Sequence, residues 1–229
     1  MERLDRNASI DKRSLSEKVY EYLANEIIEG RLRYGDRLNI KQIATILQVS
    51  TMPIRDAIKR MEMEKVVTVN PRSRCYIKVP TRKEVMDAFE SRKLIELHCI
   101  EKIYNRVASL ELEKLEEIVG KMENLLKTVK TDDRIPEYIK LDRMYHQELC
   151  NLADNEYLKK FYREINLHLN MNYTYGIGVY PDLPGTCKDH REILNCLKNN
   201  SPAAVELLEA HLDQSKRNII SGEVFKSLS

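Results

Sequence analysis

Glycine and proline are scarce in this chain of 229 residues, which contains seven of each. Charged residues make up 32% of the sequence. β-Sandwiches and barrels need many turns rich in glycine and proline, so this composition favours a helix-rich protein instead. The length allows one large domain or two domains of ordinary size, and either arrangement can bury a substantial core.

Long apolar runs are also missing. No segment approaches the ~20 apolar residues that span a membrane, and no signal peptide opens the chain, so we expect a cytoplasmic protein with no membrane partner. The five cysteines are odd in number and form no Cys-x-x-Cys pair. We therefore expect free thiols in a reducing compartment.

The segment Leu38–Met61 contains two short helical patterns joined by Gln48-Val49-Ser50. Apolar residues recur every three or four positions in both patterns, so each helix has one apolar face. Ser50 is a natural N-cap for the second helix, and Pro53 falls in its first turn, where a missing N–H costs little. A helix-turn-helix with polar residues facing outward is the geometry that reads base edges in a major groove, although two packed helices without DNA also give this pattern.

Further signals flank the helix-turn-helix. Ser14 to Glu17 form a capping box, and the helix that follows is expected to end at Gly30 in a left-handed cap. Strands over 66–69 and 75–79 are predicted to form a hairpin, or wing, with two arginines at its tip. Residues 1–13 lack periodicity and are expected to form a loose arm. Residues 1–79 are therefore predicted to be a winged helix-turn-helix DNA-binding domain.

The net charge of +2 is divided unevenly. Residues 1–80 contain 16 Lys and Arg against 11 Asp and Glu, whereas residues 81–229 contain 22 against 25. The N-terminal third is thus the part able to attract phosphate. Arg55 is expected to bond a guanine edge or a phosphate, and Lys59 is as well explained as a solvated surface lysine. The candidate DNA-binding residues are Lys41, Thr51, Met52, Arg55, Lys59, Arg72 and Arg74.

From residue 80 onward the pattern predicts an all-α antiparallel bundle of six helices, so the whole chain is expected to be mainly α. The helices are predicted near 81–106, 109–130, 135–152, 155–174, 187–198 and 202–221. A capping box at Thr81 to Glu84 opens the first of them. The glycines and prolines of 175–186 predict a loop that can cover a pocket.

Four polar residues of this half fall on apolar helix faces. Asp142 and His146 lie one turn apart on the third helix, with His190 on the fifth and His211 on the sixth. Burying an unpaired carboxylate costs several kcal/mol, so Asp142 needs a partner. Three inward histidines and one carboxylate suit a divalent transition metal, while a buried Asp–His hydrogen bond without metal explains the pair equally well.

The N-terminal motifs resemble those of the GntR family of bacterial transcription regulators. They stand here as Gly30-Arg31-Leu32-Arg33-Tyr34-Gly35, Leu38, Ile43-Ala44 and Val49-Ser50-Thr51-Met52-Pro53-Ile54-Arg55-Asp56-Ala57-Ile58. The family usually has Arg at the position of Thr51 and glycine at the position of Lys65 and near Arg74. The resemblance implies DNA binding without fixing the operator sequence.

The C-terminal half resembles the all-helical FCD domain of the FadR branch, in its shorter VanR-like form. Many members bind a metal through an Asp-x-x-x-His pair and two later histidines, which implies Asp142, His146, His190 and His211 as ligands. Zinc is the default expectation, with nickel, manganese and iron open, because imidazole and carboxylate ligands do not discriminate sharply among them.

The resemblance also implies a small organic acid as effector. Arg92 and Glu96 lie on the inward stripe of the first bundle helix and match the family's Arg-x-x-(Leu/Ile)-Glu pattern. Arg92 is expected either to clamp an effector carboxylate or to form an ion pair with Glu96. His168 and Asn172, on the fourth helix, are further candidate effector contacts.

Together these features predict a homodimeric transcription regulator, not an enzyme, whose operator binding responds to a small carboxylic acid. Two alternatives stay open. The metal can be purely structural, with no effector. Alternatively, the bundle can be a hydrolase that uses metal-bound water, for which Glu96 is the only inward carboxylate placed to act as a general base.

Overall fold

The computed structural model describes residues 14–28, 30–70, 74–104, 106, 112–129, 134–175 and 182–221, with only the helical course given for Ile28 and 166–175. The chain divides into two compact units. One unit comprises Met1–Ile27 and Leu32–Lys78, and the other comprises Ile28–Arg31 and Val79–Ser229. Within the described ranges no helix is long and apolar enough to cross a membrane.

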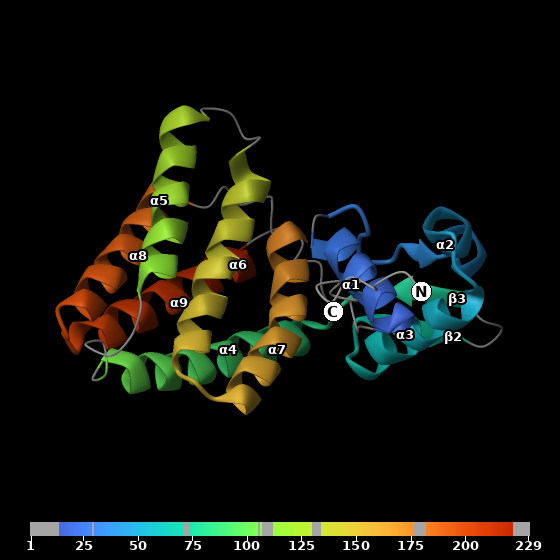
Figure 1. Ribbon diagram of the computed structural model, residues 1–229, viewed down its shortest axis with the longest axis horizontal. Helices are drawn as coiled ribbons and strands as arrows, with labels where there is room; N and C mark the ends of the chain where they lie inside the picture. Colours follow the sequence, from blue (N-terminus) through green and yellow to red (C-terminus); the bar gives the residue numbers. More distant parts are fainter. Residues whose placement is uncertain are drawn as a thin grey trace, which may run out of the picture. The chain divides into compact units, whose positions relative to one another are not determined.

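The N-terminal unit combines helices with a small antiparallel sheet (Figure 1). Its elements are α1 (Leu15–Ile28), β1 (Arg37–Leu38), α2 (Ile40–Leu47), α3 (Thr51–Met63), β2 (Val67–Asn70) and β3 (Arg74–Ile77). The strand order is β1-β3-β2, so the hairpin predicted as a wing gains β1 as an edge strand. Strand β1 was not predicted, because two residues are too few for an alternating pattern to appear.

The predicted apolar faces of this unit form its core. Ile54, Ala57, Ile58 and Met61 of α3 are buried, as are Val19, Leu23 and Ile27 of α1. Packing one face of α3 inward leaves its other face for solvent or a partner.

Helix ends in this unit follow the predicted signals with one exception. Ser14 Oγ accepts the Glu17 N–H at 3.2 Å, and Gly30 has the predicted left-handed backbone, with φ 73°. Ser50 occupies the N-cap position of α3 with an extended backbone, but its side chain makes no capping hydrogen bond. Asn39, which was not predicted as a cap, instead accepts the N–H groups of Lys41 and Gln42 at the start of α2.

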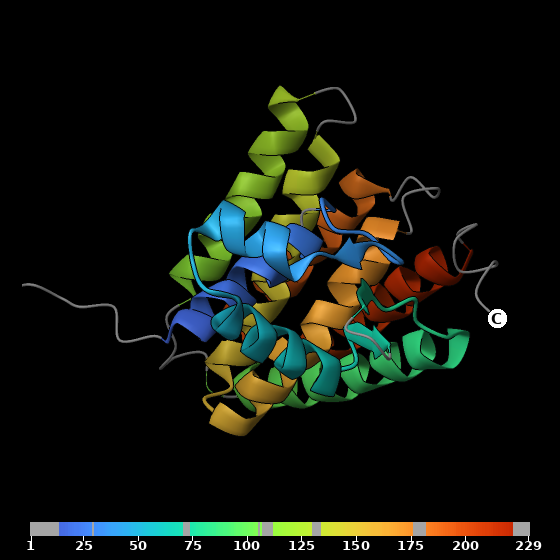
Figure 2. The same ribbon diagram turned by 90° about the vertical axis from the view of Figure 1, so that its right-hand side faces the viewer.

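The described part of the C-terminal unit consists of helices without strands. They are α4 (Arg82–Tyr104), α5 (Glu113–Thr128), α6 (Arg134–Leu152), α7 (Glu156–Tyr175), α8 (Leu183–Lys198) and α9 (Ala203–Ser221). Helices α6, α7 and α9 pack against α4, and α5 packs against α6 and α8 (Figures 1 and 2). The predicted capping box forms in both directions, because Thr81 N–H donates to Glu84 Oε2 at 2.9 Å and Glu84 N–H donates to Thr81 Oγ1 at 3.2 Å.

The predicted loop over 175–186 is wrong at its C-terminal end, where α8 begins at Leu183. Asp182 caps this helix by accepting the Gly185 N–H at 3.0 Å, and Pro184 lies in the first turn, where proline is tolerated. A Cβ atom on residue 185 would meet the Asp182 carboxylate, so a larger residue there would displace the capping side chain. Residues 176–181 of the predicted loop lie outside the described residues.

The cysteines are free thiols, as predicted. Cys75, Cys99, Cys150 and Cys187 are buried as small apolar side chains, and Cys196 is half-buried.

Candidate functional site

The polar and charged residues that are buried as whole side chains in the described part of the chain lie together at one place. The buried polar or charged residues are Arg92, Glu96, Asp142, His146, His190 and His211. They come from four helices, α4, α6, α8 and α9, and the sequence pattern placed each of them on an inward stripe. Isolated buried charges are unfavourable, so the arrangement of these six side chains must compensate their desolvation.

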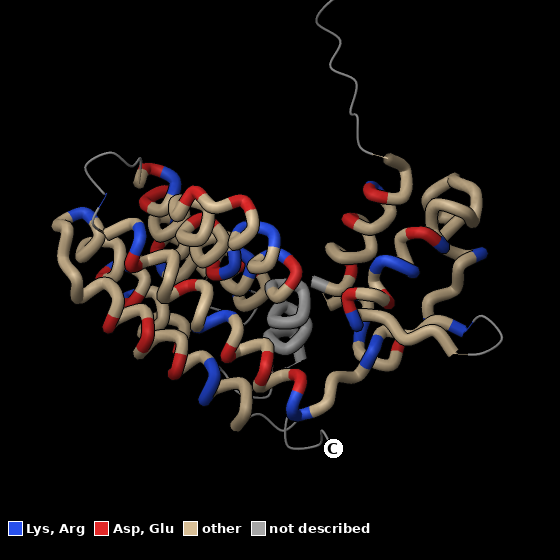
Figure 3. Tube along the Cα trace, turned by 90° about the horizontal axis from the view of Figure 1, so that it is seen from below, with Lys and Arg blue, Asp and Glu red and all other residues tan. Residues whose placement is uncertain are grey.

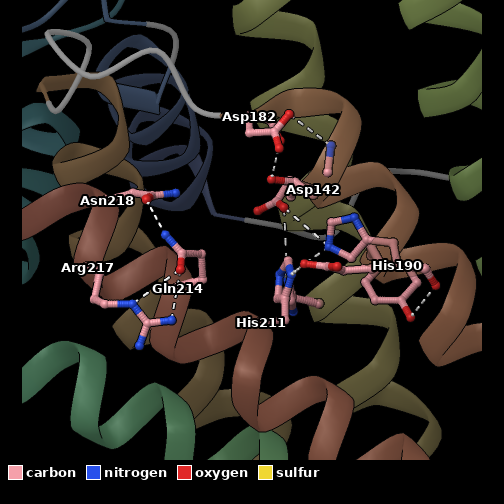
Figure 4. A network of polar contacts seen from close by, with 12 residues as sticks. Asp142, Asp182, His190, His211, Gln214, Arg217 and Asn218 are labelled. Atoms are coloured by element: carbon pink, nitrogen blue, oxygen red, sulfur yellow. Dashed lines mark hydrogen bonds and ion pairs between the residues drawn. The ribbon is translucent and has the colours of Figure 1, made fainter.

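Three histidine rings turn their Nε2 atoms toward one point. His146 Nε2 lies 3.3 Å from His190 Nε2 and 3.2 Å from His211 Nε2. Asp142 Oδ1 lies 3.4 Å from His190 Nε2 and 3.8 Å from His146 Nε2. Figure 4 shows Asp142, His190 and His211 facing one another from separate helices. One donor atom from each of the four residues lies within 4.8 Å of all the others.

This donor set fits a divalent metal. Ligands about 2.0–2.1 Å from a tetrahedral zinc ion are separated by about 3.3 Å, close to the spacings between these nitrogen and oxygen atoms. Three imidazoles and one carboxylate are also ligand types that zinc and its neighbours accept.

The Nδ1 atoms of two rings point outward to carboxylates. His146 Nδ1 lies 2.6 Å from Glu96 Oε2, and His211 Nδ1 lies 3.3 Å from Asp189 Oδ2. A carboxylate can only accept a hydrogen bond. Glu96 and Asp189 therefore each favour the histidine tautomer that carries its hydrogen on Nδ1 and leaves a lone pair on Nε2. The outer carboxylates thereby prepare the inner nitrogens to act as ligands. His190 Nδ1 is buried and has no hydrogen-bond partner among the described residues.

Glu96 connects the histidines to α4 and α7. Its Oε1 accepts Arg92 Nε–H and the Tyr162 hydroxyl, each at 2.7 Å, while Oε2 accepts from His146. Burial by itself raises the pKa of Glu96, but the adjacent His146 ring and Arg92 guanidinium outweigh burial and hold this pKa at about 2. Glu96 is therefore a carboxylate at neutral pH, able to fix the His146 ring.

Burial keeps the rings of His146 and His190 neutral. It lowers the pKa of His146, with Glu96 opposing the shift, and lowers the pKa of His190 further, where the neighbouring His211 and His146 rings add to the effect. Neutral imidazole is the form that coordinates a metal.

Several residues around this centre were not singled out from the sequence. Tyr145 is fully buried, its ring centroid is 4.5 Å from that of His190, and its hydroxyl donates to the His190 carbonyl at 3.3 Å. Tyr162 supports Glu96 as described above. Both tyrosines lie within apolar stripes, where a tyrosine is indistinguishable from an ordinary core residue. Asp189 had a usable signal, since it directly precedes a predicted ligand.

The candidate effector residues are placed unequally. Arg92 is only 2% exposed and forms the ion pair with Glu96 that was one of its two predicted roles. His168 and Asn172 belong to α7, but their side chains lie outside the described residues.

The candidate DNA-binding residues lie on the surface of the N-terminal unit. Lys41 on α2 and Arg74 on β3 are exposed, as are four residues of α3: Thr51, Met52, Arg55 and Lys59. Arg72 lies outside the described residues. Figure 3 shows the basic positions of this unit interspersed with acidic ones, in keeping with a modest positive charge. Lys65, where the family usually has glycine, has φ 59°, a backbone that glycine adopts more readily.

Two family descriptions match the sequence. "Bacterial regulatory proteins, gntR family" matches residues 15–77, and "FCD domain" matches residues 87–214. The chain belongs to the GntR family, with a C-terminal FCD domain. This confirms the predicted family. The protein is therefore a DNA-binding transcription regulator of the GntR family.

Individual relatives agree with this assignment. An uncharacterised helix-turn-helix transcriptional regulator of Bacillus subtilis, YdhC, is 27% identical over 201 residues, covering 86% of this regulator and 87% of the relative. The gluconate operon transcriptional repressor of the same species is 23% identical over 157 residues, which cover 68% of this regulator and 62% of the repressor. A crystal structure of a GntR-type regulator from Rhodococcus sp. RHA1 superposes with a TM-score of 0.80 at 19% identity, covering 91% and 99%, and shares the fold. The predicted fold class, a winged helix-turn-helix followed by a helical domain, is confirmed.

Proposed function

We propose that a small organic acid controls operator binding by this regulator, and that it binds at a divalent metal held by Asp142, His146, His190 and His211. The observation that carries the proposal is the convergence of three Nε2 atoms and one carboxylate oxygen inside a buried bundle. A cluster of facing imidazole nitrogens is unfavourable without a cation or shared protons between them, and a metal satisfies all of the lone pairs at once.

Zinc is the metal we propose first, with nickel, manganese and iron as alternatives. A bound divalent ion would supply a Lewis-acidic centre to which an effector carboxylate can add as a further ligand. The side chain of Asp142 is 12% exposed, against 0–2% for the three histidines, so the effector would approach on the Asp142 side.

The class of effector is supported by a relative. The gluconate operon transcriptional repressor is named for an operon of an organic acid. We assign Arg92 and Glu96 the task of holding His146, since their charged groups pair with each other inside the protein, and we propose His168 and Asn172 as effector contacts.

Hydrolysis is less well supported as a function. A metal-dependent hydrolase needs a base beside the metal-bound water. Among the described residues, Glu96 is the buried glutamate next to the cluster, and both of its oxygens accept hydrogen bonds from Arg92, Tyr162 and His146. A carboxylate held in this way positions a ligand and is poorly placed to take up a proton.

Metal analysis and thermal shift with the full-length protein test the proposal. We expect about one metal ion per chain in the native protein, loss of the ion in His146→Ala and retention in the matched control His98→Ala, because His98 is an exposed histidine on α4. Small carboxylic acids should raise Tm only in metal-loaded protein.

Each other outcome contradicts a defined part of the proposal. Native protein without metal, which also fails to gain Tm on adding zinc, would contradict the metal site. Metal that raises Tm with no acid shifting it further would favour the purely structural metal. Turnover of a substrate by the metal-loaded protein would revive the hydrolase.

We further propose that two copies of the chain act together on DNA. In helix-turn-helix dimers each recognition helix enters one of two successive major grooves, about 34 Å apart. Light scattering should give the mass of a dimer, and an anisotropy titration should show preference for its own operator over random duplex. A monomer that binds with full affinity would contradict the dimeric arrangement.

A further inference from the structure

The first turn of α3 presents two uncharged side chains to the outside. Thr51 and Met52 are exposed, and Met52 is 64% exposed, whereas Ile54 directly after Pro53 is fully buried. The charged residues Arg55 and Lys59 follow one and two turns later on the exposed side. The start of the recognition helix is therefore chemically different from the rest of its outer face.

In a helix-turn-helix the N-terminal residues of the second helix contact base edges. Methionine has no hydrogen-bond donor and only a weak acceptor, so Met52 cannot read the donor and acceptor pattern of a base pair. The C5-methyl group of thymine is the one apolar feature that a base pair presents in the major groove. Thr51 adds a methyl group of its own beside a hydroxyl.

We propose that Met52, aided by Thr51, reads thymine through its C5-methyl group. This inference rests on the DNA binding of the GntR family and specifies the readout of that same surface. A base without the C5-methyl group cannot make this apolar contact with Met52. Losing a contact the size of one methylene should lower the affinity for DNA roughly four-fold.

The position of the thymine follows from helix geometry. Met52 and Arg55 are three residues apart, which is about 4.5 Å along a helix. Successive base pairs rise by about 3.4 Å, so the thymine lies one or two base pairs from the position that Arg55 faces.

The experiment starts from a random-sequence duplex pool, from which the full-length protein selects its preferred sites. Each thymine of an enriched duplex is then replaced singly by uracil, which removes only the methyl group, and affinity is measured by anisotropy. The variants are Met52→Ala and the matched control Met63→Ala. Met63 is also an exposed methionine of α3, at 78%, but it lies eleven residues further on, about 16 Å along the helix.

We expect one thymine per half-site at which uracil weakens the native protein and the Met63→Ala protein roughly four-fold, with Met52→Ala indifferent to the change. The inference is overturned if uracil has no effect at any position in the native protein, or if Met52→Ala keeps the full effect. Thr51→Ser, which removes one methyl and keeps the hydroxyl, should reduce the effect only in part. A pool with no enriched sequence would contradict specific DNA binding itself, and so is distinguishable from failure of the thymine contact.

Discussion

The two units place their charged groups differently. In the described part of the N-terminal unit every buried side chain is apolar, and the candidate DNA-binding residues lie on the surface. The C-terminal unit buries two carboxylates, one guanidinium and three imidazoles in a single cluster. Substitutions on the surface of the first unit should therefore change DNA binding without changing stability. Substitutions in the buried cluster of the second unit should change metal binding and stability together.

The strongest test of this contrast is Glu96→Ala. It leaves the Arg92 guanidinium buried without its carboxylate and removes the acceptor of His146. Loss of one partner of a buried ion pair costs about 3–5 kcal/mol, so the free energy of unfolding in urea should fall by that amount. Glu101→Ala, at an exposed position of the same helix, should change it by less than about 0.5 kcal/mol. Equal effects would mean that the cluster does not stabilise the bundle as described.

The pH dependence of metal-free protein is the next test. The pKa values of His146 and His190 are lowered in the folded state, from about 6.5 in an unfolded chain. Below pH 6.5 the unfolded chain binds more protons than the folded one, so stability falls as pH falls, by up to about 1.4 kcal/mol per pH unit for each histidine. The low pKa of Glu96 adds little slope here, because its stabilisation is lost as pH falls from about 4.3, the pKa of an unfolded glutamate, to about 2.

Chemical denaturation between pH 7.5 and 5.5 measures that slope. His190→Gln should reduce it, while His98→Gln, at an exposed position, should leave it unchanged. If the free energy of unfolding of the metal-free protein without substitutions does not change over this pH range, the fold does not keep the buried rings neutral.

Arg55→Ala probes the opposite behaviour in the N-terminal unit. Arg55 is exposed on α3, so its loss should leave Tm within about 1 °C of the native value. If Arg55 reads a guanine edge, operator affinity should fall by about 1–3 kcal/mol with relaxed specificity at one position. A uniform loss over all sequences, with a smaller salt dependence, would instead assign Arg55 to phosphate. A fall in Tm without any loss of affinity would contradict the contrast between the units.

The same contrast governs what could be predicted from the sequence. Helical periodicity locates the inward stripes, and it correctly predicts an inward orientation for Arg92, Glu96, Asp142, His146, His190 and His211. Periodicity records which way a side chain faces and carries no information on its neighbours across the bundle. The contacts of Glu96 with His146 and of Tyr162 with Glu96 join residues 50 and 66 positions apart, and they depend on how the helices pack in three dimensions.

Two elements, strand β1 and the start of helix α8, could not be predicted from short-range sequence signals alone. Strand β1 pairs Leu38 with Cys75, and this pairing is fixed by a hairpin that lies far away in the sequence. Helix α8 starts early because Asp182 supplies a cap that outweighs the nearby proline and glycine. Breaker residues thus predict a loop only where no capping side chain stands just before them.

The smallest expected effect concerns two predicted caps, one in each unit. Thr81 exchanges hydrogen bonds with Glu84, so Thr81→Ala should reduce the free energy of unfolding by about 1 kcal/mol. Ser50 has the backbone of a cap but no side-chain bond to α3, so Ser50→Ala should leave stability unchanged. Urea denaturation of both variants provides the measurement. An equal loss for Ser50→Ala would show that its hydroxyl does cap α3 in solution, and would make the start of the recognition helix as rigidly held as that of α4.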